Sequence, residues 1–367
     1  MKLNKVILSG GGTGGHIFPA LSIANEIKNR YPQCEILFVG ALGRMEMEKI
    51  PAAGYQIIGL PVMGFPRKPS FKVFYFFGSL IRSASIAKNI VNDFKPQIAI
   101  GVGGYASGPL LRAAAKKRIP TLIQEQNSYA GITNKLLSKK ADSICVAYDN
   151  MERYFPKEKI IFTGNPVREN LIENLEEKAE AQKYFGLKKS AKVILIVGGS
   201  LGARSINNAV LKNIDLVADS GIQVIWQTGA YYYDKIQNNI GNTKPDNLQI
   251  HKFLTRMDLA YSVADVVISR AGAGTISELC LVGKPSVLVP SPNVSEDHQT
   301  KNAMALVEKD AAIMVRDNEI DEKLFPAAFK IVEDFEKCKS LAENIKKLAK
   351  PDATSSIVDE VEKLVMK

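Results

Sequence analysis

The stretch that decides the fold of the first half of the chain is KVILSGGGTGGH, residues 5–16. A short apolar run enters a turn built almost entirely of glycine, and helical spacing follows over residues 19–29. This order is typical of a buried parallel strand that is followed by a tight turn and a helix. Backbone N–H groups in such a turn can converge on an anion at the positive end of the helix dipole. The stretch therefore predicts a doubly wound α/β domain with a phosphate site.

The same glycines also match the dinucleotide fingerprint G-x-G-x-x-G at Gly10, Gly12 and Gly15. A dehydrogenase would need an acidic residue at the end of the second strand to hold a ribose. Glu35 begins that strand, and GALG, residues 40–43, ends it. The sequence therefore disfavours a nicotinamide enzyme.

Alternation of strands and helices continues along the chain. The strands expected from short β-branched runs are 5–9, 35–40, 97–102 and 121–124, and, after TGNP at 163–166, 192–197, 223–227, 266–269 and 286–289. Helical spacing covers 19–29, 71–93 and 109–117 in the first half. Repeated strand-helix units predict parallel sheets covered by helices on both faces.

We therefore expect an α/β protein of two doubly wound, Rossmann-like domains that face a cleft. Residues 1–165, joined by a C-terminal helix over 346–367, would form the first domain, and residues 166–345 would form the second. The charged helical segment 173–187 is interpreted as a solvated face without chemistry.

Charge is distributed unevenly between the halves. Residues 1–165 hold 22 Lys and Arg against 10 Asp and Glu, whereas the remainder holds 26 against 28. The basic excess of the first half suggests that it faces a polyanion, either nucleic acid or an anionic membrane. Four widely spaced cysteines with no C-x-x-C pair suggest neither a disulfide framework nor a zinc site, so a reducing cytosol fits best. The N-terminal apolar run is too short for a signal peptide.

Three further Gly-rich turns follow expected strands: GVGGYASGP at 101–109, GGSLGA at 198–203 and RAGAGTISE at 270–278. Ser200 is expected to donate its hydroxyl at a helix start. Glu278, one turn inside its helix, could accept two hydroxyls of a ribose. The alternative for Glu278 is a capping box with Thr275. Each turn alone can also be purely structural.

Residues 71–81, FKVFYFFGSLI, are apolar around nearly a whole helix, and Arg67, Lys68, Lys72, Arg82 and Lys88 border them. This combination is typical of a helix that lies in a membrane interface. The stretch is about half of the ~20 residues that a membrane-spanning helix needs. A buried core helix is the alternative. Stacking on single-stranded nucleic acid is disfavoured because the aromatic residues are consecutive.

Seven motifs in order, GGTGGHIFPA, GGYASGP, EQN, TGNPVR, GGSLGA, SRAGAGTISE and HQTKNA, resemble the peptidoglycan UDP-GlcNAc transferases that act on undecaprenyl-diphospho-muramoyl-pentapeptide. The resemblance spans nearly the whole chain. It implies a GT-B fold and inverting transfer of N-acetylglucosamine at the cytoplasmic face of the cell membrane. It also implies that residues 1–165, with the helix 346–367, form the acceptor- and membrane-facing domain and that residues 166–345 form the domain that binds the UDP-sugar donor. The donor contacts that it implies are Thr13, Gly14, Gly15, Asn127, Arg168, Ser200, Leu254, Ala273, Gly274, Thr275, Ile276, Ser277, Glu278 and Gln299.

Two Gly-rich turns in the first domain suit the diphosphate of a lipid-linked acceptor. The residues expected to contact it are Gly14, Gly15, Gly103, Gly104, Tyr105 and Ser107. His16 is the candidate base, because it alone of three histidines lies in a Gly-rich turn and its ordinary pKa of ~6.5 suits proton removal. Alternatively, His16 orients the acceptor while a carboxylate takes the proton.

No D-x-D sequence occurs in the chain, so we expect neither a metal nor another cofactor at the leaving diphosphate. The helix dipole, Ser200 and Arg168 would stabilise it instead, unless Arg168 is only a surface charge of the linker. The expected partners are UDP-GlcNAc, the lipid-linked muramoyl-pentapeptide and an anionic membrane surface, with other cell-wall synthesis proteins as further candidates and no nucleic acid. The rival functions are a UDP-sugar epimerase and a non-catalytic assembly protein.

Overall fold

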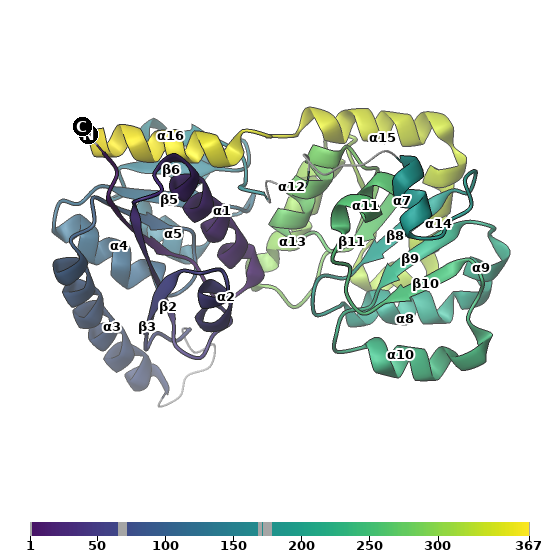
Figure 1. The fold of residues 1–367 in the computed structure, drawn as a ribbon, viewed down its shortest axis with the longest axis horizontal. Helices are drawn as coiled ribbons and strands as arrows, with labels where there is room; N and C mark the ends of the chain where they lie inside the picture. The colour runs from purple at the N-terminus through teal and green to yellow at the C-terminus, as the bar shows by residue number, and fades with distance from the viewer. Residues whose placement is uncertain (1, 65–71, 168–170, 172–177, 367) are drawn as a thin grey trace. The chain divides into compact units, whose positions relative to one another are not determined.

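The computed structural model describes residues 2–64, 72–167, 171 and 178–366. The chain divides into two compact units (Figure 1). Unit 1 comprises Met1–Arg168 together with Lys350–Lys367, and unit 2 comprises Glu169–Ala349. The C-terminal segment thus belongs to the same unit as the N-terminus.

Unit 1 is built on a seven-stranded parallel sheet with the order β3-β2-β1-β4-β5-β6-β7. Its strands are β1 (Lys5–Ser9), β2 (Glu35–Ala41), β3 (Gln56–Leu60), β4 (Ile98–Gly101), β5 (Thr121–Glu125), β6 (Ser143–Val146) and β7 (Ile160–Phe162). Its α-helices are α1 (Gly14–Arg30), α2 (Glu46–Ala52), α3 (Lys72–Phe94), α4 (Ser107–Lys116), α5 (Ile132–Ser138) and α16 (Ala353–Met366). In the register of the central strand, Ile7 lies between Leu37 and Ala99.

Alternate residues of β1 enter different cores, because successive side chains of a strand point to opposite faces of the sheet. Val6 and Leu8 pack in a buried cluster with α1 and α16, whereas Ile7 packs in a second cluster with α3 and α4. Both faces of the sheet are therefore covered, as the sequence pattern predicted.

Unit 2 contains a six-stranded parallel sheet with the order β10-β9-β8-β11-β12-β13. Its strands are β8 (Val193–Val197), β9 (Gln223–Gln227), β10 (Leu248–His251), β11 (Val266–Ser269), β12 (Ser286–Leu288) and β13 (Ile313–Met314). Its α-helices are α7 (Lys178–Tyr184), α8 (Arg204–Lys212), α9 (Ile214–Asp219), α10 (Tyr233–Ile240), α11 (Met257–Val263), α12 (Ala273–Val282), α13 (His298–Val307), α14 (Ile320–Glu333) and α15 (Phe335–Lys347). The two doubly wound sheets confirm the α/β prediction.

One predicted helix start is wrong. The helical spacing of the sequence over residues 19–29 suggested that the first helix begins at Pro19. The helix α1 begins at Gly14 instead, and Pro19 lies inside it. His16 therefore belongs to the first turn of a helix rather than to the Gly-rich turn itself.

The four cysteines are free thiols, and three of them are buried. Burial raises the pKa of the Cys34 thiol to about 11, so the thiol is protonated at neutral pH. Burial likewise raises the pKa of Cys280 to about 12. These two side chains act as small core residues rather than as nucleophiles.

Among the described residues, no helix has both the length and the apolar character that crossing a membrane would require.

Candidate active site

The strand order of each sheet reverses at one point, and open α/β sheets bind ligands at that point, beyond the carboxyl ends of the strands. In unit 1 the reversal falls between β1 and β4, which are neighbours in the sheet. The turns GGGTGG, residues 10–15, and GVGGY, residues 101–105, lie at the carboxyl ends of these two strands. Their backbones touch so closely that a Cβ added at Gly104 would lie 2.6 Å from the carbonyl oxygen of Gly11. The sequence therefore places two Gly-rich turns in one site.

His16 is held between these two turns. Its Nδ1 lies 2.9 Å from the carbonyl oxygen of Gly11. A Cβ added at Gly103 would lie 2.8 Å from Nε2, so the ring packs directly on the Gly103 backbone, which has a φ of +104°. Since a carbonyl can only accept a hydrogen bond, Nδ1 carries the proton and Nε2 carries the lone pair of the neutral ring. This tautomer suits a base that acts through Nε2.

The start of α1 has the features of an anion site. Thr13 is the residue before the helix, and its hydroxyl does not cap the first turn. Gly14 is partly exposed and Gly15 is exposed. The first N–H groups of a helix have no partner within the helix and favour an anion. Thr13, Gly14 and Gly15 thus lie as expected for phosphate contacts.

One backbone N–H of the first Gly-rich turn already donates to a side chain that the sequence analysis did not identify. Gly12 donates its N–H to Oε2 of Glu46 over 2.8 Å. Glu46 is fully buried at the start of α2, just after the second strand. Glu46 lies three residues beyond GALG, residues 40–43, where the sequence pattern ended the strand, so this carboxylate was not considered.

The second turn contributes less polar chemistry than expected. Ser107 is fully buried, and its hydroxyl lies 2.8 Å from the carbonyl oxygen of Gly103 and 3.1 Å from that of Ser9. It therefore shapes the turn and cannot reach a ligand, contrary to the sequence expectation. Tyr105 is 50% exposed, and its hydroxyl lies close to Gly64.

Asn127 follows β5, the neighbour of β4 in the sheet. The buried carboxylate of Glu125 accepts from the backbone N–H of Asn127 over 3.1 Å and from its Nδ2 over 3.2 Å. The other carboxylate oxygen accepts from Gly131 and from Asn134. Glu125 thus fixes the loop that carries Asn127. Arg168, the other predicted contact in this unit, lies outside the described residues.

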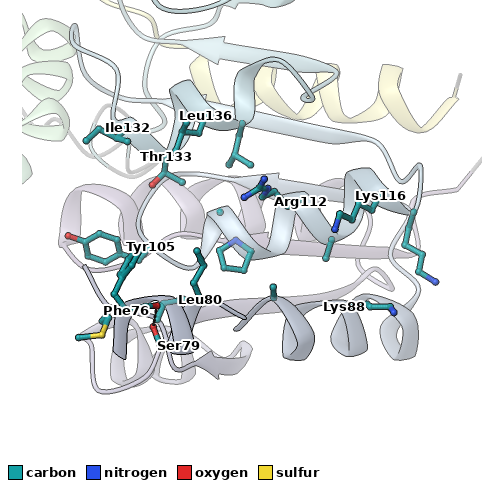
Figure 2. Close-up of a pocket in the computed structure, with 18 residues that line it drawn as sticks. Phe76, Ser79, Leu80, Lys88, Tyr105, Arg112, Lys116, Ile132, Thr133 and Leu136 are labelled. Carbon is teal, nitrogen blue, oxygen red and sulfur yellow. Dashed lines mark hydrogen bonds between the residues drawn. The ribbon is translucent and has the colours of Figure 1, made fainter. Parts of the chain in front are cut away.

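An apolar groove of about 790 Å³ runs between α3, α4 and α5 of unit 1 (Figure 2). Phe76 and Leu80 of α3 and Leu136 of α5 contribute apolar side chains to it. Lys88 and Lys116 lie toward the opposite end from Phe76 and Tyr105 (Figure 2). One end of the groove therefore lies beside the turn that carries Tyr105, and the other end lies beside the side chains of Lys88 and Lys116.

In unit 2 the strand order reverses between β8 and β11. A cavity of about 710 Å³ lies at this point. Polar groups and glycines line it from the turns after both strands, from the first turns of α8 and α12, and from α13. Among them are Gly198, Gly199, Arg204, Ser205, Arg270, Gly272, Thr275 and Gln299. The cavity has the position and lining expected for a diphosphate.

The structure corrects the expectation for Ser200. The helix α8 begins at Arg204, so exposed Ser200 lies four residues before it and not at the helix start. Gly199, with a φ of +94°, and the bond from Gly202 N–H to Gly199 oxygen over 3.0 Å lengthen the turn. Arg204 lines the cavity from the helix start, and the sequence analysis missed it as a candidate cation.

Gln227 is a further residue that the sequence analysis missed, after Glu46 and Arg204. Its buried carboxamide donates to the Gly199 oxygen over 3.1 Å and accepts from the backbone N–H of Leu254 over 2.8 Å. The Leu254 side chain is also buried, so only backbone atoms of this residue suit contact with a base. Gln227 links the Gly-rich turn to the loop that carries Leu254.

The helix α12 begins at Ala273, and Gly272 is its N-cap. Thr275 lies inside the helix, so the capping-box alternative for Glu278 is wrong. The buried hydroxyl of Tyr261 donates to Oε2 of Glu278 over 3.1 Å. The Glu278 carboxylate is thus held by a neighbouring helix rather than by its own helix start.

The remaining predicted donor contacts are Ala273, Gly274, Ile276, Ser277 and Gln299. Ala273 and Ile276 have buried side chains, so any contact they make uses backbone atoms. The Ser277 hydroxyl donates to the Ala273 oxygen over 3.0 Å. A Cβ added at Gly274 would meet no atom within 4 Å. Oε1 of Gln299 accepts from the Ser291 N–H over 2.8 Å while the residue lines the cavity.

Arg270 is half-buried in the lining of the cavity. Its guanidinium donates to Asp317 over 2.6 Å and to the Ser205 hydroxyl over 2.7 Å, and further to the carbonyl oxygens of Val289 and Pro290. Ser205 also donates to Asp317 over 2.6 Å. Because its donors are engaged in this way, Arg270 ties α8 to the turn after β11.

Comparisons with known proteins match both units. The N-terminal domain of glycosyltransferase family 28 matches residues 6–146, and its C-terminal domain matches residues 193–357. A protein of Parabacteroides distasonis is 56% identical over 367 residues, which cover all of both chains. A protein of Bacteroides fragilis is 56% identical over 362 residues, 98% of this chain and 95% of that one. Both are called UDP-N-acetylglucosamine--N-acetylmuramyl-(pentapeptide) pyrophosphoryl-undecaprenol N-acetylglucosamine transferase.

Two solved structures are informative. MurG of Acinetobacter baumannii has a TM-score of 0.79 and 29% identity, and the match covers 98% of this chain and 99% of that one. A UDP-GlcNAc 2-epimerase of Neisseria meningitidis, solved with bound UDP-GlcNAc, has a TM-score of 0.66 at 16% identity, covering 98% and 100%. The epimerase likeness shows the shared fold alone. The two Rossmann-like units have the GT-B fold, and the chain belongs to glycosyltransferase family 28.

Proposed function

We propose that this enzyme transfers N-acetylglucosamine from UDP-GlcNAc to undecaprenyl-diphospho-N-acetylmuramoyl-pentapeptide, with inversion at the anomeric carbon. The observation that carries the proposal is the 56% identity to the Parabacteroides distasonis transferase over every residue of both chains. The product is the lipid-linked disaccharide-peptide precursor of peptidoglycan.

The donor would bind in the cavity of unit 2. Its diphosphate suits the turn after β8 and the start of α8, where Arg204 adds a positive charge. Its ribose suits Glu278, whose carboxylate Tyr261 fixes. Its uracil suits backbone atoms at Leu254, a loop that Gln227 ties to the phosphate turn. Thr275 and Gln299 line the same cavity and suit the remaining polar groups.

The acceptor diphosphate would bind at the start of α1, against Thr13, Gly14 and Gly15, with Gly103 and Gly104 closing the site. His16 would remove the proton of the attacking sugar hydroxyl. The tautomer that Gly11 imposes supports this role, because it leaves the lone pair on Nε2.

Membrane docking by unit 1 would bring the enzyme to its lipid-linked acceptor. Phe77 and Ile81 of α3 are 52% and 72% exposed, and Leu136 of α5 is 77% exposed, which does not fit a buried core helix. Exposed Arg82 and Lys88 accompany them on α3. Anionic lipid attracts such cations while apolar side chains enter the interface. Phe71, Arg67 and Lys68 of the expected patch lie outside the described residues.

The test of the activity is transfer of radiolabelled N-acetylglucosamine from UDP-GlcNAc to the detergent-solubilised lipid acceptor. We expect label in the lipid fraction and stoichiometric release of UDP. An epimerase would instead convert the labelled donor without acceptor, and an assembly protein would leave it unchanged. Either of those results would refute the proposal.

Replacement of the base provides the matching mechanistic prediction. His16→Ala should lower kcat by about 10²–10⁴-fold, the range typical of losing a general base. His251→Ala, at the end of β10 in unit 2, is the control for loss of a histidine. Near-normal kcat of His16→Ala at saturating substrates would exclude His16 as the base, whereas a raised KM for the acceptor alone would favour the orienting role.

A further inference from the structure

Glu46 is a fully buried carboxylate in the middle of the acceptor site of unit 1. Two glycines make room for it. A Cβ added at Gly11 would lie 2.1 Å from Oε1, and a Cβ added at Gly40 would lie 2.6 Å from Cγ. Buried carboxylates are rare unless they are paired or hydrogen-bonded. A larger residue at Gly11 or Gly40 would therefore clash with the Glu46 side chain.

Two backbone amides hold the carboxylate. Ala41 donates its N–H to Oε1 over 3.0 Å, and Gly12 donates its N–H to Oε2 over 2.8 Å. No lysine, arginine or histidine within the described part of the chain forms an ion pair with Glu46. The negative charge is therefore directed onto peptide dipoles.

One of these peptide groups also contacts the candidate base. The N–H of Gly12 and the C=O of Gly11 belong to the same peptide group. Its N–H donates to Glu46, and its oxygen accepts from Nδ1 of His16 over 2.9 Å. Hydrogen bonds in such a chain polarise one another in the same direction. The carboxylate therefore strengthens the carbonyl as an acceptor for the imidazole.

We propose that Glu46 is a positioning residue for His16 and that it acts through the Gly11–Gly12 peptide. By fixing the plane of that peptide, Glu46 holds the proton on Nδ1 and the lone pair on Nε2. In hydrolase triads a carboxylate contacts the histidine directly and fixes its tautomer. Here a peptide group is interposed between the two side chains. The inference rests on the proposed role of His16 as the base.

The peptide has a second reason to need an anchor. Gly12 has a φ of +86°, and glycine loses much conformational freedom when it is ordered. Without Glu46, the N–H of the Gly11–Gly12 peptide would lose the hydrogen-bond acceptor that fixes it. Only the His16 bond and the packing of Gly11 against Gly104 would then hold this peptide.

The experiment uses nitrogen-15 NMR of the imidazole rings in the full-length protein, at a pH where the rings are neutral. Only three histidines are present, so the His16 signals can be assigned by comparison with His16→Ala. In the wild type we expect His16 to be mainly the Nδ1–H tautomer. Glu46→Gln removes the charge with little change of shape, and Glu46→Met removes both acceptor oxygens. Both should shift His16 toward a mixture of tautomers, Glu46→Met more strongly.

Kinetics provide the second readout. Both variants should lower kcat by about tenfold or more, with little change in the KM for UDP-GlcNAc, because the donor cavity belongs to unit 2. Glu48→Gln is the matched control, since Glu48 is exposed on the same helix. Hydrogen exchange of residues 5–146 reports whether unit 1, which carries Glu46 and Glu48, keeps its fold in each variant.

Two results separate this inference from the proposed function. If the tautomer of His16 is the same in Glu46→Gln, Glu46→Met, Glu48→Gln and the wild type, Glu46 does not position His16. If the tautomer shifts while kcat is unchanged, Glu46 positions His16 as inferred, and the role of His16 as base is wrong.

Discussion

At the scale of single residues, the carboxylates and amides that organise each site were the hardest to predict. Glu46 and Gln227 bond to backbone groups that lie 34 and 27 residues away in the sequence. Nothing in the local pattern marks a buried polar side chain whose partner is remote. Residues in the Gly-rich turns were found because the turn itself requires glycine. The role of Ser107 was not predictable, because this first residue of α4 donates its hydroxyl to Ser9 at the end of β1, 98 residues earlier.

Glu278 leads to a prediction at this scale. A charged acceptor of two ribose hydroxyls would contribute about 1.5–3 kcal/mol per hydrogen bond. Two such bonds give about 3 kcal/mol at the lower figure, so Glu278→Ala should weaken UDP binding by roughly 100-fold or more, since about 1.4 kcal/mol corresponds to tenfold. Isothermal titration calorimetry with UDP measures the effect. The control is Glu336→Ala, an exposed carboxylate of the same unit. Unchanged affinity in a folded Glu278→Ala protein would remove the ribose role.

At the scale of elements, the sequence predicted the central strands well and the outer strands poorly. The strands β1, β9 and β11 have the predicted bounds, and they are buried on both faces and rich in valine and isoleucine. The strand β3 alternates between exposed and half-buried residues, and β13 has only two residues. Short or half-exposed strands at an edge lack the continuous apolar run by which a buried parallel strand is recognised.

The helix α3 provides the prediction at this scale. The double variant Phe77→Ser and Ile81→Ser removes two exposed apolar side chains, each of which would contribute about 1.5–3 kcal/mol if fully buried in lipid. Binding to anionic vesicles, measured by co-sedimentation, should fall at least tenfold. Wild-type binding should rise with the anionic lipid fraction and fall with salt.

Phe335→Ser is the matched control for α3, since Phe335 is an exposed phenylalanine of unit 2. Circular dichroism establishes that each variant keeps its fold. Equal binding of the wild type to neutral and anionic vesicles, or no loss in the α3 variant, would contradict docking through this helix.

At the scale of the whole molecule, the chain leaves unit 1 after Arg168 and returns to it at Lys350. The returning helix α16 packs beside α1 and buries Ile357, Val358 and Val361 in the core of unit 1 (Figure 1). Arg30 of α1 bonds to Asp359 over 2.6 Å and to Glu362, and further to Ser355. The sequence suggested that a C-terminal helix over 346–367 joins the first domain, and the structure places the return to unit 1 at Lys350.

Removal of residues 350–367 should therefore unfold unit 1 while unit 2 stays folded. Each large apolar side chain withdrawn from the core costs about 1.5–3 kcal/mol, so the loss is comparable with the ~5–15 kcal/mol stability of a whole domain. Hydrogen exchange should show lost protection in residues 5–146 and retained protection in unit 2, which should still bind UDP. The control is removal of Met366 and Lys367, since Met366 is 60% exposed. Full protection of unit 1 in the shorter chain would contradict this prediction.

The return of the chain also sets the order of events on the ribosome. Domains usually fold as units while the nascent chain emerges, the N-terminal one first. Here the residues that unit 1 needs from α16 are translated after the whole of unit 2, which is complete once Ala349 has emerged. Unit 2 is therefore expected to fold first, although it begins later in the sequence. Unit 1 cannot close its apolar core until residues 350–367 have been synthesised.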